Sequence, residues 1–251
     1  MSRLFRALSE AGALTLLSVR ALRVLLTRPF ELRLGLLQME RIGLGSFGVA
    51  GITTLFTGMV LALQTAFSLP GLGVKYYIGT VVGKSLTREL GPVLTALIVG
   101  GRVGAGIAAE IGSMKVTEQI DALRSMAADP VRKLVAPRLA ACLLMIPVLT
   151  LYGDLLGIFG GMLVAVTQLD LEAAFYLTDV MDSLRIADVA SGLGKSFVFA
   201  YFIAIVACHR GLTVQGGADG VGRATTETVV TTSILVLISD FFLTKLFYVL
   251  G

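Results

Sequence analysis

Charged residues are almost absent from five long stretches of the chain, and apolar residues dominate each of them. Roughly 20 consecutive apolar residues are enough to cross the hydrocarbon core of a bilayer as a helix. We therefore predict five transmembrane helices, over about 43–67, 90–111, 135–166, 193–212 and 229–250. The third is long enough to tilt or to bend at Pro147, whereas the purely apolar part of the fourth is short.

The residues before Gly43 follow a different pattern, in which leucines alternate with arginines at helical spacing. This pattern is typical of an amphipathic helix in the membrane interface, and Pro29 divides it into two helices. A cleaved secretory signal is the alternative, because the segment starts with basic residues. It fails because arginines recur throughout and no uninterrupted apolar core with a small-residue cleavage site follows. The arginines are Arg3, Arg6, Arg20, Arg23, Arg28, Arg33 and Arg41.

The composition of the chain also indicates a membrane protein. Apolar residues make up 55% of the 251 residues, charged residues make up 15%, and the mean hydropathy is +0.86. Ordinary soluble domains carry about 25% charged residues. We therefore expect an all-α integral membrane protein, with interfacial helices over 1–42 and a five-span domain over 43–251.

The charges of the connecting segments predict the orientation of the chain. Basic residues outnumber acidic ones in the N-terminal segment and over 113–138, whereas acidic residues dominate over 167–194. Because cytoplasmic loops are enriched in lysine and arginine, we expect the first two segments inside and the third outside. The first outer loop is an exception, since it is basic. Five spans then place the N-terminus in the cytoplasm and the C-terminus outside.

A short polar stretch within the loop over 113–134 has helical periodicity. Its apolar side chains fall at i, i+4, i+7 and i+11 on one narrow face, namely Val116, Ile120, Leu123 and Ala127. Polar side chains lie opposite, namely Glu118, Asp121 and Ser125. Thr117 is a candidate N-cap, and Asp129 and Pro130 end the predicted helix. The helix is too short and too charged to span, so it either lies on the lipid surface or docks into a groove on a soluble partner.

Ionisable side chains at membrane depth are costly and usually face a bundle interior or a wet cavity. Arg102 lies within the second span, and its pairing with Asp154 or Asp240 would simply hold helices together.

Arg88, Glu89 and Lys195 fall at the predicted outer ends of spans. There they either contact a polar or anionic head group or snorkel to the interface as anchors, and the physics of the side chains leaves both open.

Three short motifs resemble nucleotide-binding signatures without the context that these require. Gly83–Ser85 and Gly194–Ser196 both read GKS, the end of a phosphate loop, but the earlier glycine of that motif is missing. Gly43–Gly48 matches a dinucleotide fingerprint but opens a membrane span. The single histidine and the two cysteines offer no metal-binding spacing. Energy for any transport must therefore come from another polypeptide or from an ion gradient.

Glycines four residues apart occur within two of the predicted spans. Gly100 and Gly104 lie in the second, and Gly157 and Gly161 lie in the third. Small residues at this spacing let helix backbones approach closely. We therefore expect the second and third spans to pack against each other.

Four blocks of the sequence resemble the MlaE-type permeases of bacterial ABC lipid transporters, which work with MCE proteins. They are LTRELGPVLTALIVGGRVGAGIAAEIGSMKVTEQIDAL (86–123), DPVRKLVAPR (129–138), KSFVFA (195–200) and GVGRATTETVVTTSILVLISDFFLT (220–244). The run R-E-L-G-P followed by A-E-I-G-x-M-x-V-T-E-Q-I-D-A-L is far more specific than a short motif. The resemblance covers nearly the whole chain.

The resemblance implies a homodimeric permease in the bacterial inner membrane, with its C-terminus in the periplasm. The implied partners are a cytoplasmic ABC ATPase of the MlaF type, a periplasmic MCE protein of the MlaD type and a STAS-domain accessory protein of the MlaB type. The implied substrate is phospholipid, moved in support of outer-membrane lipid asymmetry. Because the ATPase would use the ATP, this chain is expected to be no enzyme and to bind neither a cofactor nor nucleic acid.

The resemblance also assigns residues to roles. Phospholipid would occupy an outward-opening cavity at the dimer interface, near Arg88, Glu89, Lys195 and Tyr76. The segment from Met114 to Met126 would be the coupling helix that inserts into the ATPase. Its implied coupling residues are Met114, Val116, Glu118, Ile120, Asp121 and Leu123.

Two other classes of protein remain open at this point. An ion-coupled secondary transporter would use Asp154 or Asp240 as a proton relay and usually shows internal repeats, and we detect none in the sequence. A membrane-embedded lipid-modifying enzyme would need a cluster of His, Asp or Ser at one interface, and the single histidine argues against most such designs.

Overall fold

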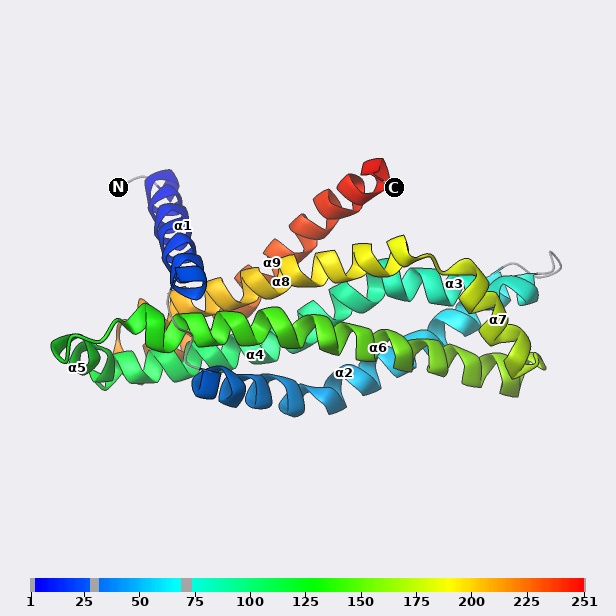
Figure 1. The fold of residues 1–251 in the computed structure, drawn as a ribbon, viewed down its shortest axis with the longest axis horizontal. Coiled ribbons are helices and arrows are strands. Elements are labelled where there is room, and N and C mark those ends of the chain that lie inside the picture. The colour runs from blue at the N-terminus through cyan, green and yellow to red at the C-terminus, as the bar shows by residue number, and fades with distance from the viewer. Residues whose placement is uncertain (1–2, 28–31, 69–73, 251) are drawn as a thin grey trace. The chain divides into compact units, whose positions relative to one another are not determined.

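The computed structural model describes residues 3–27, 32–68 and 74–250, and nearly all of them are helical (Figure 1). The α-helices are α1 (Arg3–Thr27), α2 (Leu32–Ser68), α3 (Ile78–Ser85), α4 (Gly91–Val116), α5 (Gln119–Ser125), α6 (Ala136–Leu169), α7 (Ala173–Ser183), α8 (Ile186–Leu212) and α9 (Gly217–Leu250). A 3-10 turn, η1 (Val74–Tyr77), precedes α3, and two π-helical turns are η2 (Leu86–Leu90) and η3 (Val131–Val135). The described ranges contain no β-strand, and the predicted all-α class is confirmed.

Five helical segments of the described chain are long and apolar enough to cross a membrane, as predicted. They are Leu32–Ser68, Ile78–Val116, Val131–Leu169, Ile186–Leu212 and Gly217–Val249. Each begins several residues before the charge-poor run from which it was predicted. Hydropathy marks only the part of a helix that suits hydrocarbon, whereas backbone hydrogen bonding continues through the more polar residues at its ends. The chain is therefore a multi-pass membrane protein.

The N-terminal part differs in its boundaries from the sequence prediction. The predicted break at Pro29 falls in 28–31, outside the described residues, with α1 ending at Thr27 and α2 beginning at Leu32. Helix α2 continues without interruption past the predicted domain boundary at 42/43. The second interfacial helix and the first span are thus one helix.

Prolines explain the irregular turns within the spans. Pro92 and Pro137 each follow a π-helical turn by two residues, and Pro147 lies inside α6. A proline has no amide hydrogen, and its ring clashes with the carbonyl four residues earlier, so the turn in front of it is often distorted, although α6 continues through Pro147. In η3 the amide of Ala136 accordingly donates to the carbonyl of Val131, five residues back.

Residue contacts divide the chain into two compact units, each assembled from segments that are distant in the sequence. The first unit comprises Met1–Leu44, Gly100–Met145 and Phe199–Val236. In this unit α1 packs on η3, which ties the N-terminal helix to the start of the third span. Its buried side chains include Ile107, Ile111, Leu139, Ile203 and both cysteines, Cys142 and Cys208.

The second unit comprises Gly45–Val99, Ile146–Val198 and Leu237–Gly251. Its core is built from α2, α3, α6 and α7, with buried side chains of Ile78, Val82, Leu86, Val164, Tyr176 and Val180. Helices α2 and α6 approach so closely that a Cβ atom at Gly58 would lie 1.9 Å from the carbonyl oxygen of Gly157. Only glycine fits there.

The glycine pairs pack as small-residue motifs, although not all with the predicted partner. A Cβ atom at Gly100 or Gly104 would meet Ile203 of α8, and one at Gly104 would also meet Thr228 of α9. These two glycines therefore face α8 and α9, and the expectation that they face the third span is wrong. Gly157 and Gly161 of the third span approach Leu86 and Val82 of the second, as well as α2.

The segments predicted as outer loops contain helices. Helix α3 occupies part of the basic first loop, and α7 lies within the acidic segment over 167–194. The two helices pack together, and both the amide and the hydroxyl of Thr80 donate to the carboxylate of Asp179 at 2.7 Å. Asp179 therefore has a structural partner beyond its contribution to the charge of the loop.

Candidate functional site

The turn that carries Arg88 and Glu89 is widened by the proline that follows it. In η2 the amide of Gly91 donates to the carbonyl of Leu86, five residues back, because Pro92 prevents a regular α-turn. Single π-turns of this kind occur frequently at functional sites. The side chains of Arg88 and Glu89 thus extend from an irregular turn within the second helical segment.

Lys195 of α8 lies at the centre of an ion cluster in the second unit. Its side chain is buried, with 1% of the residue exposed, and its ammonium is ion-paired with the carboxylate of Glu89. The ammonium also lies 3.1 Å from Oδ1 of Asp240 and donates to Oγ1 of Thr244 at 2.7 Å. The ammonium donates hydrogen bonds to Glu89 and Thr244, whereas Asp240 contributes an ion pair, because its Oδ1 accepts no hydrogen bond from the described residues. Burial of this charge is tolerated because two carboxylates face it.

The lysine cluster, defined as Glu89, Lys195, Asp240 and Thr244, joins three segments of the unit and carries an excess of acid. The hydroxyl of Thr244 lies within 3.3 Å of both carboxylate oxygens of Glu89, which closes the network. Two carboxylates face one ammonium, and the Glu89 side chain is 40% exposed. Glu89 is therefore the member of the cluster that a ligand can reach.

Arg88 points into a neighbouring cavity of about 630 Å³. Its guanidinium lies 3.5 Å from the carboxylate of Asp188, which is itself fixed because its Oδ2 accepts from the backbone amide of Arg185 at 2.9 Å. Pockets for small ligands commonly measure 300–1,000 Å³ and combine apolar walls with a few polar groups. The lining residues are Arg88, Arg185, Ala187, Asp188, Ala190, Ser191, Phe247 and Tyr248.

The helical segments of the second and fourth spans extend beyond their predicted outer ends. They begin at Ile78 and Ile186, so Glu89 and Lys195 each lie several residues inside a helix, and their place at the outer ends of the spans stays a prediction. Snorkelling does not describe Lys195, because its ammonium ends in the ion cluster and not at the surface.

Tyr76 lies away from the residues that line this cavity. It is exposed, and its ring makes an edge contact with Phe175 of α7, with 5.7 Å between the ring centroids.

The two acids that were predicted to pair with Arg102 have different surroundings in the second unit. Asp240 belongs to the lysine cluster, and Asp154 is buried against Gly91, where a Cβ atom would lie 1.7 Å from its Oδ1. This oxygen accepts no hydrogen bond from the residues that the structure describes. Arg102 belongs to the first unit and lines a pocket there. Its pairing with either acid stays a prediction.

The loop between the second and third spans does contain a short helix, but its boundaries differ from the prediction. Val116 is the last residue of α4, and the hydroxyl of Thr117, in the turn that follows, donates to the carbonyl of Ser113 and caps no new helix. Glu118 then adopts a left-handed conformation, with φ of +58°, and α5 starts at Gln119.

Helix α5 also ends earlier than predicted. It stops at Ser125, before Ala127, which has φ of +56°. Asp129 and Pro130 begin η3 instead, because Oδ1 of Asp129 accepts from the amide of Val131. A proline at the start of a helix is favourable since its amide hydrogen is not needed there.

Ile120 is the buried side chain of α5, and the acidic and basic residues of the helix lie at the surface. Asp121 accepts from Nζ of Lys115 at 2.9 Å and from Arg124 at 3.0 Å. The hydrogen bond from Lys115, with help from both positive charges, lowers the pKa of the Asp121 carboxyl below its ordinary value. Leu123 and Met114 are partly buried. The predicted coupling segment is therefore an exposed, charged turn of helix held to its own protein by Ile120.

Sequence reasoning missed several residues of the site, among them Thr244, Asp188 and Arg185. Thr244 lies in an apolar span and carries no charge, so nothing in the pattern singled it out. Asp188 and Arg185 were counted only as loop charges that set the orientation. Their signal was an acid three residues after the residue that precedes a helix. An acid at this position typically accepts a hydrogen bond from the backbone amide of that preceding residue.

Comparisons with known proteins agree in their class. A family model described as Permease MlaE matches residues 36–246. A probable ABC transporter permease protein of Rickettsia conorii is 47% identical over 239 residues, which are 95% of this chain and 92% of that protein. One of Synechocystis sp. is 45% identical over 211 residues, 84% of this chain and 80% of that protein. The chloroplastic protein trigalactosyldiacylglycerol 1 of Arabidopsis thaliana is 38% identical over 211 residues, 84% of this chain and 60% of that protein.

Proposed function

Because this chain belongs to the MlaE permease family, we propose that it is the membrane subunit of an ABC transporter that moves phospholipid between the bacterial inner membrane and a periplasmic MCE protein. The coarser assignment, a multi-pass ABC transporter permease, follows from the family and from the names of the relatives. A permease of this class implies an ATP-hydrolysing partner. We propose that the transport supports the lipid asymmetry of the outer membrane and that a STAS-domain protein accompanies the ATPase.

The observation that carries the lipid proposal is the pairing of the lysine cluster with the cavity at Arg88. Guanidinium groups bind phosphate bidentately, and Arg88 and Arg185 both line the cavity beside Phe247 and Tyr248. Such a lining suits an amphiphile with an anionic head group. One relative also carries the name of a lipid, which supports a lipid substrate.

The mechanism that we propose is mechanical, and no residue of this chain performs covalent chemistry. ATP would be bound and hydrolysed by the partner, and the resulting movement would change how tightly the cavity holds lipid. A ligand or nucleotide shifts a conformational equilibrium only by its difference in affinity for the two states. The lysine cluster is suited to such a difference because it links η2, α8 and α9, and any relative movement of these segments breaks satisfied contacts of a buried charge.

We propose that α5 is the surface that receives the ATPase. The helix exposes Asp121, Arg124 and the neighbouring Glu118 and Met126, while Ile120 anchors it. An exposed short helix with charges and a methionine suits docking into a groove of a soluble protein. Both GKS motifs lie inside helices α3 and α8, which supports placing the nucleotide on the partner.

A homodimer is the assembly that we propose for the permease. Only 11% of the apolar window of Gly217–Val249 is buried within one chain. Its exposed side chains include Val230, Ile234, Leu237, Ile238 and Phe241. Lipid could cover such a face, but the low burial of a span otherwise rich in Thr and Ser supports contact with a second copy.

The test of the proposed function is purification of the tagged chain from its own bacterium, followed by reconstitution with fluorescent phospholipid. We expect an ATP-hydrolysing subunit and a periplasmic MCE protein to copurify, and lipid transfer to require ATP. Transfer driven by a proton gradient without ATP would favour the secondary transporter instead. A purified assembly without any ATPase subunit would overturn the proposal.

A further inference from the structure

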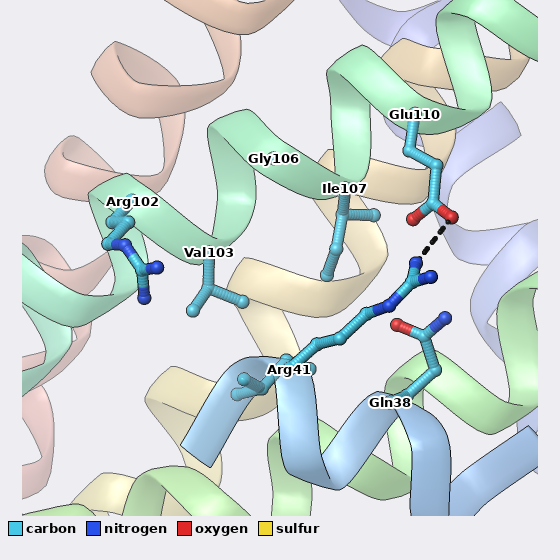
Figure 2. Close-up of a pocket in the computed structure, with 8 residues that line it drawn as sticks. Gln38, Arg41, Arg102, Val103, Gly106, Ile107 and Glu110 are labelled. Carbon is cyan, nitrogen blue, oxygen red and sulfur yellow. Dashed lines mark hydrogen bonds and ion pairs between the residues drawn. The ribbon is translucent and has the colours of Figure 1, made fainter. Parts of the chain in front are cut away.

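A second pocket, of about 370 Å³, lies within the first unit between α2 and α4 (Figure 2). We refer to it as the Arg41 pocket. Its lining residues are Gln38, Arg41, Ile42, Arg102, Val103, Gly106, Ile107 and Glu110. It shares no residue with the cavity at Arg88, and the proposed function does not use it.

The charges around the Arg41 pocket have a positive excess. Glu110 is shared by two arginines, with Oε1 3.1 Å from Arg41 and Oε2 2.8 Å from Arg138. The side chain of Arg138 is 4% exposed, whereas that of Arg41 is 67% exposed. A buried charge without its partner strongly destabilises the fold. The Glu110 carboxylate is therefore needed to balance the charge of Arg138. Arg41 therefore carries surplus positive charge, and Arg102 is the second guanidinium of the lining.

The pocket has room beside its apolar wall. Val103 and Ile107 are buried and form part of this wall, as Figure 2 shows, with the side chain of Arg41 reaching across toward Glu110. A Cβ atom at Gly106 would meet no atom within 4 Å. The open volume thus continues up to the backbone of α4.

The position of Arg41 in the sequence places the pocket at the edge of the hydrocarbon layer. Arg41 is the last charged residue before the uncharged run over 43–67. Arginines at this depth lie at the level of lipid phosphates. Basic pockets between transmembrane helices are a recognised way of holding anionic head groups.

We propose that the Arg41 pocket binds the phosphate-bearing head group of an anionic phospholipid from the surrounding leaflet. Arg41 contacts the phosphate, Arg102 adds positive charge about two turns from Glu110 along α4, and Gln38 is placed to donate to the polar end of the head group. The acyl chains stay in the bilayer beside α2 and α4. Such a lipid braces α2 against α4 in the unit that also carries α5, and its role is structural and not that of the transported molecule.

The test uses the full-length chain in nanodiscs of phosphatidylcholine with added phosphatidylglycerol, followed by native mass spectrometry. Gly106→Leu places a side chain in the pocket, where a Cβ atom meets no atom within 4 Å, and Gly48→Leu is the matched control, because Gly48 also has no neighbour within 4 Å of a Cβ atom but lies outside the pocket. We expect the wild type and Gly48→Leu to retain phosphatidylglycerol. Gly106→Leu and Arg41→Gln should each weaken retention about tenfold or more, the size expected when a charge-assisted hydrogen bond is lost.

The location and the source of the ligand are checked separately. Photoreactive phosphatidylglycerol should label peptides of α2 and α4 around Arg41 and Gly106, and Arg102→Lys should retain more lipid than Arg102→Gln. Equal retention in all variants, or labelling elsewhere only, would overturn the proposal. Displacement of the label by soluble glycerol phosphate as effectively as by phosphatidylglycerol would also overturn it, since the site would then take a free phosphate ester and not a lipid.

Discussion

The ammonium of Lys195 lies 3.1 Å from Oδ1 of Asp240, although the two residues are on different helices, α8 and α9. Neither partner is free to move without a cost, since Lys195 is 1% exposed and also holds Glu89. A helix pair joined by a buried charge resists relative movement, because separating the helices would leave that charge without a partner.

Replacing Lys195 by methionine tests this link. Lys195→Met keeps the length of the side chain but leaves Glu89 and Asp240 without a counter-charge. We expect a loss of about 2 kcal/mol, less than the roughly 3–5 kcal/mol of a fully buried pair, because both acids are partly exposed. Thermal unfolding of the solubilised chain would measure it. Adding Glu89→Gln and Asp240→Asn should restore most of the stability, and an unchanged unfolding temperature in the single variant would contradict the assignment.

The carboxyl of Asp121 should titrate at an unusually acidic pH. Lys115 and Arg124 stabilise its charged form, so its folded pKa lies below the ordinary value of 3.8. A lowered carboxyl pKa gives stability that is present above the unfolded pKa and is lost as the pH falls through the folded pKa. We therefore expect α5 to be insensitive to pH from 5 to 8 and to loosen only below about pH 4. NMR of labelled aspartate should show the midpoint rise in Lys115→Ala, and a midpoint unaffected by that change would count against the ion pair.

Glu118 allows the backbone and the side chain of the coupling segment to be separated. Its φ of +58° is a conformation that glycine adopts at no steric cost. Glu118→Gly should therefore keep the turn before α5. Its stability should equal that of the wild type or exceed it by up to about 1 kcal/mol. If the carboxylate contacts the ATPase, the complex assembled with this variant should hydrolyse ATP poorly in response to lipid, even though the turn is intact. Coupling equal to the wild type would mean that Glu118 is needed only for the turn, and Asp121→Lys would then carry the docking test.

The contact between α2 and α6 leaves no room for a methyl group at Gly58. A Cβ atom there would lie 1.9 Å from a backbone oxygen of Gly157, and a backbone atom cannot swing aside as a flexible side chain can. Gly58→Ala should destabilise the second unit by about 1–3 kcal/mol, as overpacking usually does. Gly48→Ala, on the same helix with open space around it, should be neutral in the same thermal unfolding assay. Similar unfolding temperatures for both variants would show that α2 and α6 are further apart than described.

Periodicity and hydropathy predict the number and approximate place of the spans because both depend on local sequence. They underestimate the length of the helices, since Ile78–Ser85 and Ile186–Lys195 carry charges and polar residues that hydropathy scores as loop. Helix α7 was missed for the same reason. Hydrogen bonds along the backbone do not depend on hydropathy, so helices continue where the hydrophobic signal stops.

The lysine cluster shows that contacts between distant helices could not be predicted from the sequence. Glu89, Lys195 and Asp240 were singled out one by one as costly charges, but their pairing was not predicted. Residues 106 positions apart meet only through the packing of whole helices, which one sequence does not reveal. In the loop, the apolar spacing correctly predicted a helix, but Ile120, expected to face lipid or a partner, is buried within the chain. It could not predict the left-handed Glu118 that separates α4 from α5.

The π-helical turn before Pro92 has a consequence for how η2 responds to its environment. Most helix distortions depend on neighbours and disappear when the neighbours change. Here the missing amide hydrogen belongs to the covalent structure of Pro92, so this cause of the distortion stays whatever lipid, detergent or partner subunit surrounds the turn. A Cβ atom at Gly192 would lie 2.1 Å from the carbonyl oxygen of Thr87 in this turn. The irregular turn beside the lysine cluster is therefore encoded in the sequence itself.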